Sequence, residues 1–273
     1  MTSPKIKKIK KKIIRKSYTI QKKIVLGFKE PYSDTLPVFI LGCGRSGTTM
    51  MLDIFHRDTR IETLGEKDTK IAGKNFMLHY NKIGPAIRAS KAPILVMKPI
   101  LNSFDAKKLL TQYEKAVVLW IVRDYRDMIA SSMKKFGDRV AAYIRNFIMH
   151  DKGDNWIVSG MKPETKKHLK TLEFGTFSDI DWMGLVWWSV NQTVLSDGLD
   201  RYEGFHLVNY ESFVNDEDAL KKIYGILGLD LKLSGSKLVH SKSIGKGHYV
   251  KMNSVVDGMC CELIEKLSGL FMK

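Results

Sequence analysis

Residues 42–49 read Gly-Cys-Gly-Arg-Ser-Gly-Thr-Thr, and this stretch decides the fold. Apolar residues at 36–41 precede it and predict a buried strand, while residues 50–55 predict the first turns of a helix. A glycine-rich loop between a strand and a helix is a common anion site, because backbone N–H groups and the helix N-terminus attract negative charge. The stretch therefore predicts an α/β fold with a phosphate-binding loop.

Three interpretations of this loop are open from its own residues. Gly42, Gly47 and Thr49 match the P-loop pattern G-x-x-x-x-G-K-[ST], but Thr48 stands where the lysine belongs. That lysine reaches the outer phosphates of ATP or GTP, so its absence argues against a nucleoside triphosphate. The loop also contains the dinucleotide pattern G-x-G-x-x-G, with Glu62 about 20 residues after the first glycine. An ordinary strand-to-helix turn is the third interpretation.

A second apolar run, at 116–122, is typical of a strand that is covered on both faces in a parallel sheet. Arg123 follows it directly, at the carboxyl end where open α/β sheets bind ligands, and Ser131 lies eight residues later. A guanidinium and a hydroxyl placed in this way can hold one phosphate. Ion pairs with neighbouring aspartates on a solvated surface are the alternative for this arginine.

Together, the two segments resemble the sulfotransferases that use 3′-phosphoadenosine 5′-phosphosulfate (PAPS) and release 3′-phosphoadenosine 5′-phosphate (PAP). The family's G-x-x-R-S-G-T-T loop binds the 5′-phosphosulfate and is matched by residues 42–49. Its arginine and serine that bind the 3′-phosphate are matched by Arg123 and Ser131. The resemblance spans roughly residues 36 to 270.

Two further elements support the resemblance. A strand that ends in a Tyr-Glu pair matches residues 208–211, and the family's tyrosine there lies near the adenine. A Ser-Ile-Gly-basic loop that closes over the nucleotide matches residues 243–246, although Gly247 follows where the family often has a tryptophan. The nucleotide-binding residues that the resemblance implies are Gly44, Arg45, Ser46, Gly47, Thr48, Thr49, Arg123, Ser131, Tyr210, Ser243, Gly245 and Lys246.

The resemblance also implies three catalytic residues. Carbohydrate and tyrosylprotein sulfotransferases often carry a catalytic glutamate after a glycine at about the position of Glu66, which follows the apolar segment 61–65. Aryl-type relatives use a histidine after the lysine of the third strand, but here Pro99 follows Lys98. We therefore expect Glu66 as the base, Lys98 near the bridging oxygen, and Arg45 at the 5′-phosphate. A surface glutamate and a snorkelling lysine are the alternatives.

Less favoured candidates for the base are Glu62, Asp68, His56 and His79.

The expected function is the transfer of a sulfuryl group from PAPS to a hydroxyl, with a carbohydrate or glycolipid acceptor favoured and no metal. The alternatives are a P-loop kinase with ATP and Mg²⁺ and a non-catalytic membrane-associated nucleotide-binding module. Polar connections at 67–92 and 151–182 are expected to bind the acceptor. Trp182, Trp187 and Trp188 could stack on a sugar or pack in the core, and core packing is favoured for Trp187.

The basic charge is concentrated at the N-terminus. The chain of 273 residues carries a formal net charge of +16, and residues 1–30 hold 11 Lys and Arg against one acidic residue. Ile6, Ile9, Ile13 and Ile20 recur there at roughly helical spacing. We expect either an amphipathic helix on an anionic membrane surface through residues 5–23 or a flexible tail. Nucleic acid is disfavoured, because no aromatic platform accompanies the charge.

The remaining residues, 31–273, are expected to form one domain with three layers: a mostly parallel sheet of about five strands between helices. Three cysteines, Cys43, Cys260 and Cys261, indicate no disulfide framework, and no export signal is recognisable, so we expect a cytoplasmic location with or without membrane contact. Strands are predicted at 36–42, 61–65, 94–98, 116–123 and 204–210. Helices are predicted at 47–57, 105–113, 125–135, 138–150, 183–199, 216–227 and 254–271.

Overall fold

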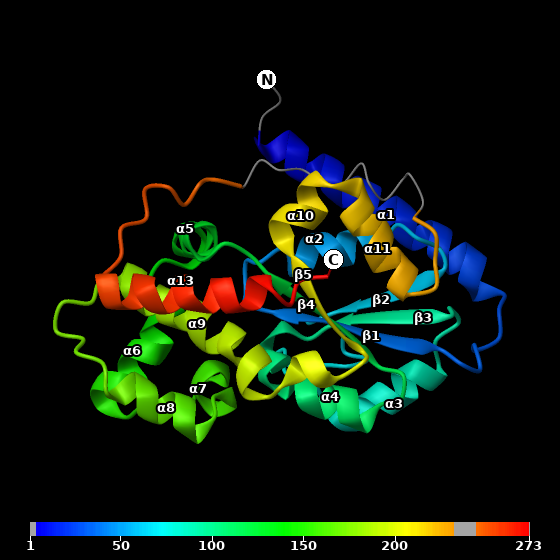
Figure 1. Cartoon of the computed structure of the whole chain (residues 1–273). Helices are drawn as coiled ribbons and strands as arrows, with labels where there is room; N and C mark the ends of the chain where they lie inside the picture. The colour runs from blue at the N-terminus through cyan, green and yellow to red at the C-terminus, as the bar shows by residue number, and fades with distance from the viewer. Residues whose placement is uncertain (1–3, 232–243, 273) are drawn as a thin grey trace.

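The computed structural model describes residues 4–231 and 244–272, and a sheet of parallel strands forms its centre (Figure 1). The order of the described strands is β2-β3-β1-β4-β5, and all neighbouring pairs are parallel. Each strand begins and ends within one residue of its predicted span, so the α/β prediction is confirmed. The strands are β1 (Leu36–Gly42), β2 (Ile61–Gly65), β3 (Ile94–Lys98), β4 (Val117–Val122) and β5 (Phe205–Asn209).

Alternation of side chains along the strands builds two separate cores. In β1, Val38 and Ile40 point to one face of the sheet, whereas Phe39 and Leu41 point to the other. Helices cover both faces, which explains why the three central strands β3, β1 and β4 are nearly continuous apolar runs. One face is covered by α2 (Thr48–Phe55), α10 (Tyr210–Asn215) and α11 (Glu217–Ile226), and the other by α3 (Tyr80–Arg88), α4 (Ala106–Gln112) and α9 (Asp179–Ser196).

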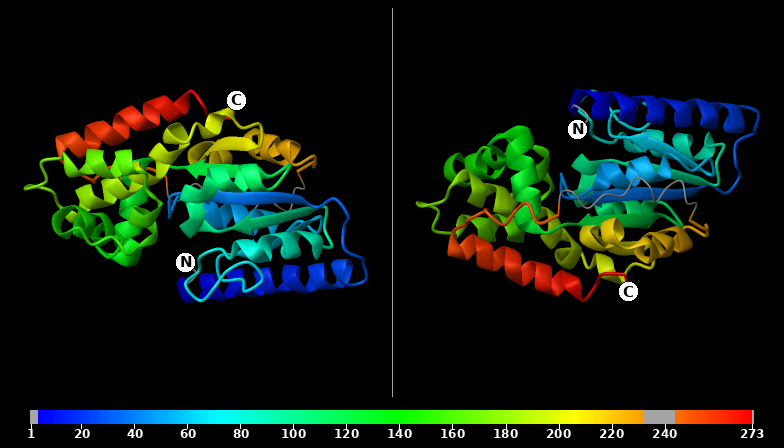
Figure 2. Two further views of the ribbon diagram at one scale, coloured as in Figure 1. Left: turned by 90° about the horizontal axis from the view of Figure 1, so that it is seen from below. Right: turned by 90° about the horizontal axis from the view of Figure 1, so that it is seen from above.

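A second group of helices lies to one side of the sheet, beyond the end of β4 (Figure 2). Helix α9 lies at its centre and is apolar on nearly every side, because α5, α6 and α13 all pack against it. Trp182 and Trp187 on this helix are fully buried, so neither can stack on a sugar, and the core interpretation is correct for both. The group comprises α5 (Tyr125–Phe136), α6 (Ala141–His150), α7 (Trp156–Gly160), α8 (Pro163–Lys170), α9 and α13 (Ser254–Ser268).

Four short helices were not predicted from the sequence: α10, which follows β5 directly, and α3, α7 and α8. Helix α3 contains Pro85, which masks the apolar period, and α7 and α8 are too short for a periodic pattern to be recognised. Helices α3, α7 and α8 lie in the connections 67–92 and 151–182, so these segments are partly helical. Two 3₁₀ helices complete the described elements, η1 (Ile100–Asp105) and η2 (Leu199–Arg201).

Residues Pro4–Gly27 form a single helix, α1, that packs against the body of the molecule. Arg15 pairs with Asp53 at 3.6 Å, and Thr19 Oγ1 lies 3.0 Å from His56 Nε2. Lys22 is buried and donates to the carbonyl oxygens of residues 55 and 61. Arg15 contacts residue 53 and Thr19 contacts residue 56, so α1 runs parallel to α2, and its first turns lie toward the carboxyl edge of the sheet.

Burial lowers the pKa of Lys22 to about 8, and it lowers that of His56 to about 4, with the nearby cationic charge of Lys22 adding to the effect. Both groups are therefore parts of the contact between α1 and α2. Within residues 4–231 and 244–272, no helix is both long and apolar enough to cross a membrane.

Candidate active site

The loop of residues 42–49 connects the end of β1 to the start of α2. Gly42 has φ +122°, and a Cβ atom there would lie 2.4 Å from the carbonyl oxygen of Ile121 in β4. Gly47 has φ +94°, and a Cβ atom there would enter the ring of Tyr210 at 2.3 Å. Arg45 also has a positive φ, 71°, which a side-chain-bearing residue rarely adopts outside functional sites. Close packing around the loop therefore requires glycine at positions 42 and 47.

Ser46 adds an unusual feature to this loop. Its side chain is fully buried, and its Oγ atom has no hydrogen-bond partner in the described part of the chain. Buried hydroxyls almost always have a partner, and such exceptions call for an explanation. Thr48 and Thr49 begin α2, whose first N–H groups have no acceptor within the helix. The loop therefore offers several donors to one anion.

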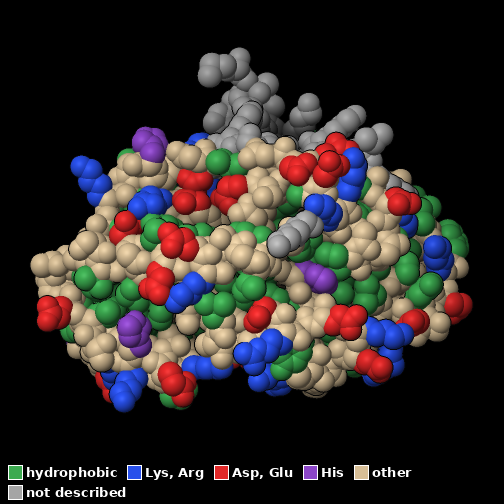
Figure 3. All heavy atoms as spheres, viewed as in Figure 1, with side chains coloured by type: hydrophobic (Ala, Val, Ile, Leu, Met, Phe, Trp, Pro, Cys, Tyr) green, Lys and Arg blue, Asp and Glu red, His purple; other side chains and the backbone are tan. Residues whose placement is uncertain are grey.

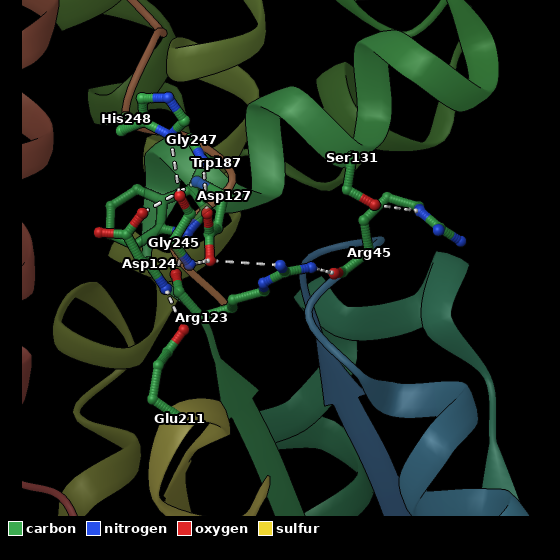
Figure 4. Close-up of polar contacts among 10 residues, drawn as sticks. All are labelled: Arg45, Arg123, Asp124, Asp127, Ser131, Trp187, Glu211, Gly245, Gly247 and His248. Atoms are coloured by element: carbon green, nitrogen blue, oxygen red, sulfur yellow. Dashed lines mark hydrogen bonds and ion pairs between the residues drawn. The ribbon is translucent and has the colours of Figure 1, made fainter. Parts of the chain in front are cut away.

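Arg45, Arg123 and Ser131 come together although 78 to 86 residues separate the first from the other two (Figure 4). Arg45 Nε donates to Ser131 Oγ at 3.1 Å, and Arg123 Nη1 donates to the carbonyl oxygen of Arg45 at 3.1 Å. Burial lowers the pKa of Arg45, and the positive charge of Arg123 lowers it further. An anion bound near both arginines would relieve this repulsion.

Arg123 lies at the carboxyl end of β4, and only 4% of its surface is exposed. Its guanidinium lies over the ring of Tyr210, 4.7 Å from the centroid, while its carbonyl oxygen accepts a bond from Trp187 Nε1 at 2.9 Å. Glu211, next to that tyrosine, accepts from the N–H of Asp124 at 3.1 Å, and burial raises the pKa of this glutamate. The Tyr-Glu pair therefore supports the segment that carries the arginine.

The predicted ion pairs of this segment are only partly correct. Arg123 does pair with Asp127, at 3.4 Å, but both side chains are buried rather than on a solvated surface. Arg126 pairs instead with Asp257 on α13, at 2.7 Å. Asp124 caps helix α5 by accepting from the N–H of residue 127.

Asp127 also holds the segment near the C-terminus. Its two carboxylate oxygens accept from the N–H groups of Gly245 at 2.8 Å and Gly247 at 2.6 Å (Figure 4). A Cβ atom on Gly247 would lie 2.3 Å from the backbone carbon of Arg126. This close approach explains why glycine follows Lys246 here, where the family often has a tryptophan. Lys246 itself is exposed, and Ser243 lies outside the described residues.

Glu66 and Lys98 form an ion pair, with Oε2 and Nζ 2.5 Å apart. Their positions follow from strand pairing, because β2 and β3 are neighbours and Gly65 is in register with Lys98. Lys98 is buried, whereas the Glu66 side chain is 30% exposed and lines a pocket that also contacts the 43–45 segment of the loop. The two residues are therefore neither a solvated surface glutamate nor a snorkelling lysine.

The less favoured bases are engaged elsewhere. Glu62 pairs with Lys70 at 3.3 Å, and His56 lies between Thr19 of α1 and residue 63. None of Glu62, Asp68, His56 and His79 lines the pocket that contains Glu66. Cys43 lies below the loop, where burial raises the pKa of its thiol to about 12, so it is protonated at neutral pH.

No protein-family model matches the chain, and no curated protein matches it. Similar solved structures include a sulfotransferase from Alicyclobacillus acidocaldarius, at 14% identity over 85% of this chain and 93% of that chain, with a TM-score of 0.47. A sulfotransferase from Mycobacterium avium has 13% identity over 89% and 78%, with a TM-score of 0.47. A mouse sulfotransferase complexed with PAP has 17% identity over 88% and 86%, with a TM-score of 0.49. Similarity this low leaves the functional assignment to the residues of this chain.

Replacement of Asp127 by asparagine removes the charge and turns one acceptor atom into a donor. We expect the amides of Gly245 and Gly247 to exchange with deuterium about 10- to 100-fold faster, because losing a hydrogen bond to a charged group costs about 1.5–3 kcal/mol. Hydrogen–deuterium exchange followed by mass spectrometry measures this. Asp138→Asn, at an exposed ion pair with Arg145, is the control. Unchanged exchange in Asp127→Asn would show that the carboxylate does not hold this segment.

Proposed function

We propose that this protein is a sulfotransferase that uses PAPS as its donor. The observation that carries the proposal is the meeting of Arg45, Arg123 and Ser131 at the carboxyl ends of the adjacent strands β1 and β4. In open α/β sheets, ligands bind at this edge, where the order of strands reverses. A nucleotide that carries phosphate at both its 5′ and 3′ positions needs two such groups of donors side by side.

The residues fit this donor. Arg45, the N–H groups of residues 46–49 and the Thr48 and Thr49 hydroxyls would hold the 5′-phosphate, and a phosphate oxygen in the loop would give Ser46 Oγ its missing partner. Arg123 and Ser131 would hold the 3′-phosphate. Tyr210 is buried against the loop and under the guanidinium of Arg123, and its place near the adenine is proposed from the resemblance alone. The segment of Gly245 and Lys246 lies on the same side, attached through Asp127.

The catalytic roles follow from the same geometry. PAPS, when bound, supplies the sulfuryl group, which is attached to its 5′-phosphate, and that phosphate is the leaving group. Glu66 would accept the proton of the attacking hydroxyl, Lys98 would stabilise charge on the bridging oxygen, and Arg45 would stabilise charge on the phosphate. Because Lys98 is buried and already paired with Glu66, the base and the cation are held in a fixed relation before the donor binds.

The acceptor proposed from the sequence is a hydroxyl on a carbohydrate or glycolipid, since Glu66 resembles the glutamate of that branch. A P-loop kinase is the competing enzyme. Thr48 occupies the lysine position of the kinase-type loop and offers a hydroxyl instead of a cation, which favours the sulfotransferase.

Removal of the Arg123 side chain should weaken PAP binding about 10- to 100-fold, because a hydrogen bond to a charged group contributes about 1.5–3 kcal/mol. Calorimetric titration of the full chain in EDTA measures this, with ATP and NAD as comparison ligands. Lys134→Ala, which removes an exposed cation from α5, the helix that follows Arg123, should bind PAP normally. Arg123→Lys provides a second variant if alanine unfolds the protein, and it should also bind more weakly because the bidentate geometry is lost.

Unchanged PAP affinity in both arginine variants would overturn the nucleotide assignment. Binding of ATP in preference to PAP, with a requirement for Mg²⁺, would establish the kinase instead.

Replacement of Glu66 by glutamine should leave PAP affinity unchanged and lower turnover by about 10²–10⁴-fold, the usual contribution of a general base. Transfer of labelled sulfate from PAPS to an acceptor measures turnover. Glu62→Gln is the matched control, because this glutamate lies on β2, which ends just before Glu66, and is outside the pocket. Near-normal turnover of Glu66→Gln would move the base to another residue.

We also propose that α1 binds an anionic membrane surface. Ile9, Ile13, Ile20 and Ile24 are each more than half exposed, between 51% and 63%. At about 100° per residue, these four positions fall within about 60° of the helix circumference. The face that packs on the body carries Arg15, Thr19 and Lys22 together with the buried Leu26, and it lies away from the isoleucines. The packing of α1 therefore leaves the apolar stripe outward.

The charges around this stripe suit anionic lipid. Lys16 and Lys23 are exposed and flank the isoleucines, and each basic residue near an anionic surface contributes about 1 kcal/mol. By contrast, acidic and basic side chains are interspersed on the face of the body seen in Figure 3. For a cytoplasmic enzyme, the partner surface would be the inner leaflet of a membrane.

The double substitution Ile13→Glu with Ile20→Glu should abolish sedimentation of the protein with phosphatidylserine-containing vesicles, because it puts two charges where apolar contact is needed. Val255→Glu, which changes an equally exposed apolar residue on α13, should sediment like the unaltered protein. Binding should also weaken as salt rises, since charge attraction is screened within about 10 Å at 0.1 M. The membrane proposal would be overturned if the double variant sedimented with vesicles as the unaltered protein does. It would also be overturned if the unaltered protein formed a dimer without vesicles and the double substitution dissociated that dimer.

A further inference from the structure

A pocket of about 360 Å³ lies directly beside the proposed nucleotide loop. Residues 43–45 of the loop and Glu66 form one of its walls. Its volume is near the lower end of the usual range for ligand sites, about 300–1,000 Å³. A group bound in this pocket would therefore have its reactive end at Glu66.

The rest of the pocket is built mainly by helices that the sequence analysis did not connect with the acceptor. Met128 and Phe136 lie on one face of α5, two turns apart, and Met183 and Val186 lie on α9. Ile100 of η1 closes the far side. From the two connections that were expected to bind the acceptor, 67–92 and 151–182, only Phe76 and Trp156 contribute to the wall.

The lining is strongly apolar. Nine of its sixteen residues are Ile, Leu, Met, Val, Phe or Trp, and none of the described lining residues is Asp, Asn, Gln or His. Three residues are charged. Arg45 and Glu66 belong to the proposed reaction site, and Arg139 donates from Nε to the carbonyl oxygen of Phe136.

This composition decides between the acceptor classes. A sugar presents many hydroxyls, and each one that enters a protein pocket needs a hydrogen-bond partner to replace water. Side-chain donors and acceptors of this kind are few away from Glu66. An aliphatic or aromatic group, in contrast, gains binding free energy in proportion to the apolar area that it removes from water.

We infer that the acceptor is an alcohol whose hydroxyl is carried by an apolar body, which the pocket encloses while the hydroxyl faces Glu66. The inference rests on the proposed sulfotransferase activity and narrows its acceptor. A free hydrophilic sugar is not a substrate of this site, and a glycolipid is one only through a hydroxyl close to its apolar part.

A series of straight-chain 1-alkanols from butanol to decanol provides the test. With the full chain saturated with PAP, the dissociation constant from tryptophan fluorescence should fall about threefold to fourfold for each added CH₂ until the pocket is filled. With labelled PAPS, the value of kcat/KM for transfer should rise in parallel. Glucose should neither bind measurably nor accept sulfate, and n-octyl glucoside serves as the amphipathic comparison.

Variants of Phe136 locate the effect. Phe136→Ser should raise the dissociation constant of octanol about tenfold, since most of an aromatic contact is lost, whereas Phe136→Leu should stay within about threefold. Phe28→Ser removes a phenylalanine that is 93% exposed and outside the pocket, so it should bind octanol normally.

The outcomes separate this inference from the activity on which it rests. PAP binding with no dependence on chain length, or with transfer to glucose as efficient as to octanol, would overturn the apolar acceptor and leave the sulfotransferase intact. If the protein does not bind PAP but binds octanol, and Phe136→Ser weakens that binding, the sulfotransferase assignment is overturned. The role of this pocket as an acceptor site is then overturned as well.

Discussion

The buried guanidinium of Arg123 is the interaction on which the rest of the site depends. A cation taken out of water is costly unless its environment compensates it. Here a carbonyl oxygen of the loop, the carboxylate of Asp127 and the face of Tyr210 provide the compensation, and they come from three separate parts of the chain. Satisfying this one group therefore fixes the positions of the loop, of helix α5 and of the segment after β5.

This constraint also explains how the two halves of the molecule are joined. The backbone of Arg123 accepts a hydrogen bond from Trp187 in the centre of the helical group, while its side chain faces the loop on the sheet. The residue thus lies where the parallel sheet ends and the helices that line the apolar pocket begin. In the proposed arrangement, the donor would bind on one side of Arg123 and the acceptor on the other.

The three central strands could be predicted from the sequence because β1, β3 and β4 are nearly continuous apolar runs, and burial on both faces is what such runs require. The loop, Arg123 and Ser131 could be selected from local spacing.

The ion pair of Glu66 with Lys98 could not be predicted, because it depends on β2 and β3 being neighbours, and strand order leaves no local trace. The buried role of Asp127 was hidden for a related reason: its partners Gly245 and Gly247 are 118 and 120 residues away. The apolar pocket beside Glu66 was missed because much of its lining comes from faces of α5 and α9 that look like ordinary core.

The double attachment of Asp127 has a thermodynamic consequence. One carboxylate pairs with Arg123 and also holds the N–H groups of Gly245 and Gly247, so two regions of the chain share a single charge. Any anion that draws Arg123 away from Asp127 must alter the hold of that carboxylate on the distant glycines. By the reciprocity of linked equilibria, whatever orders or loosens the glycine segment changes the affinity for that anion by the same factor. Binding of an anion at Arg123 and ordering of the Gly245–Gly247 segment are therefore thermodynamically coupled.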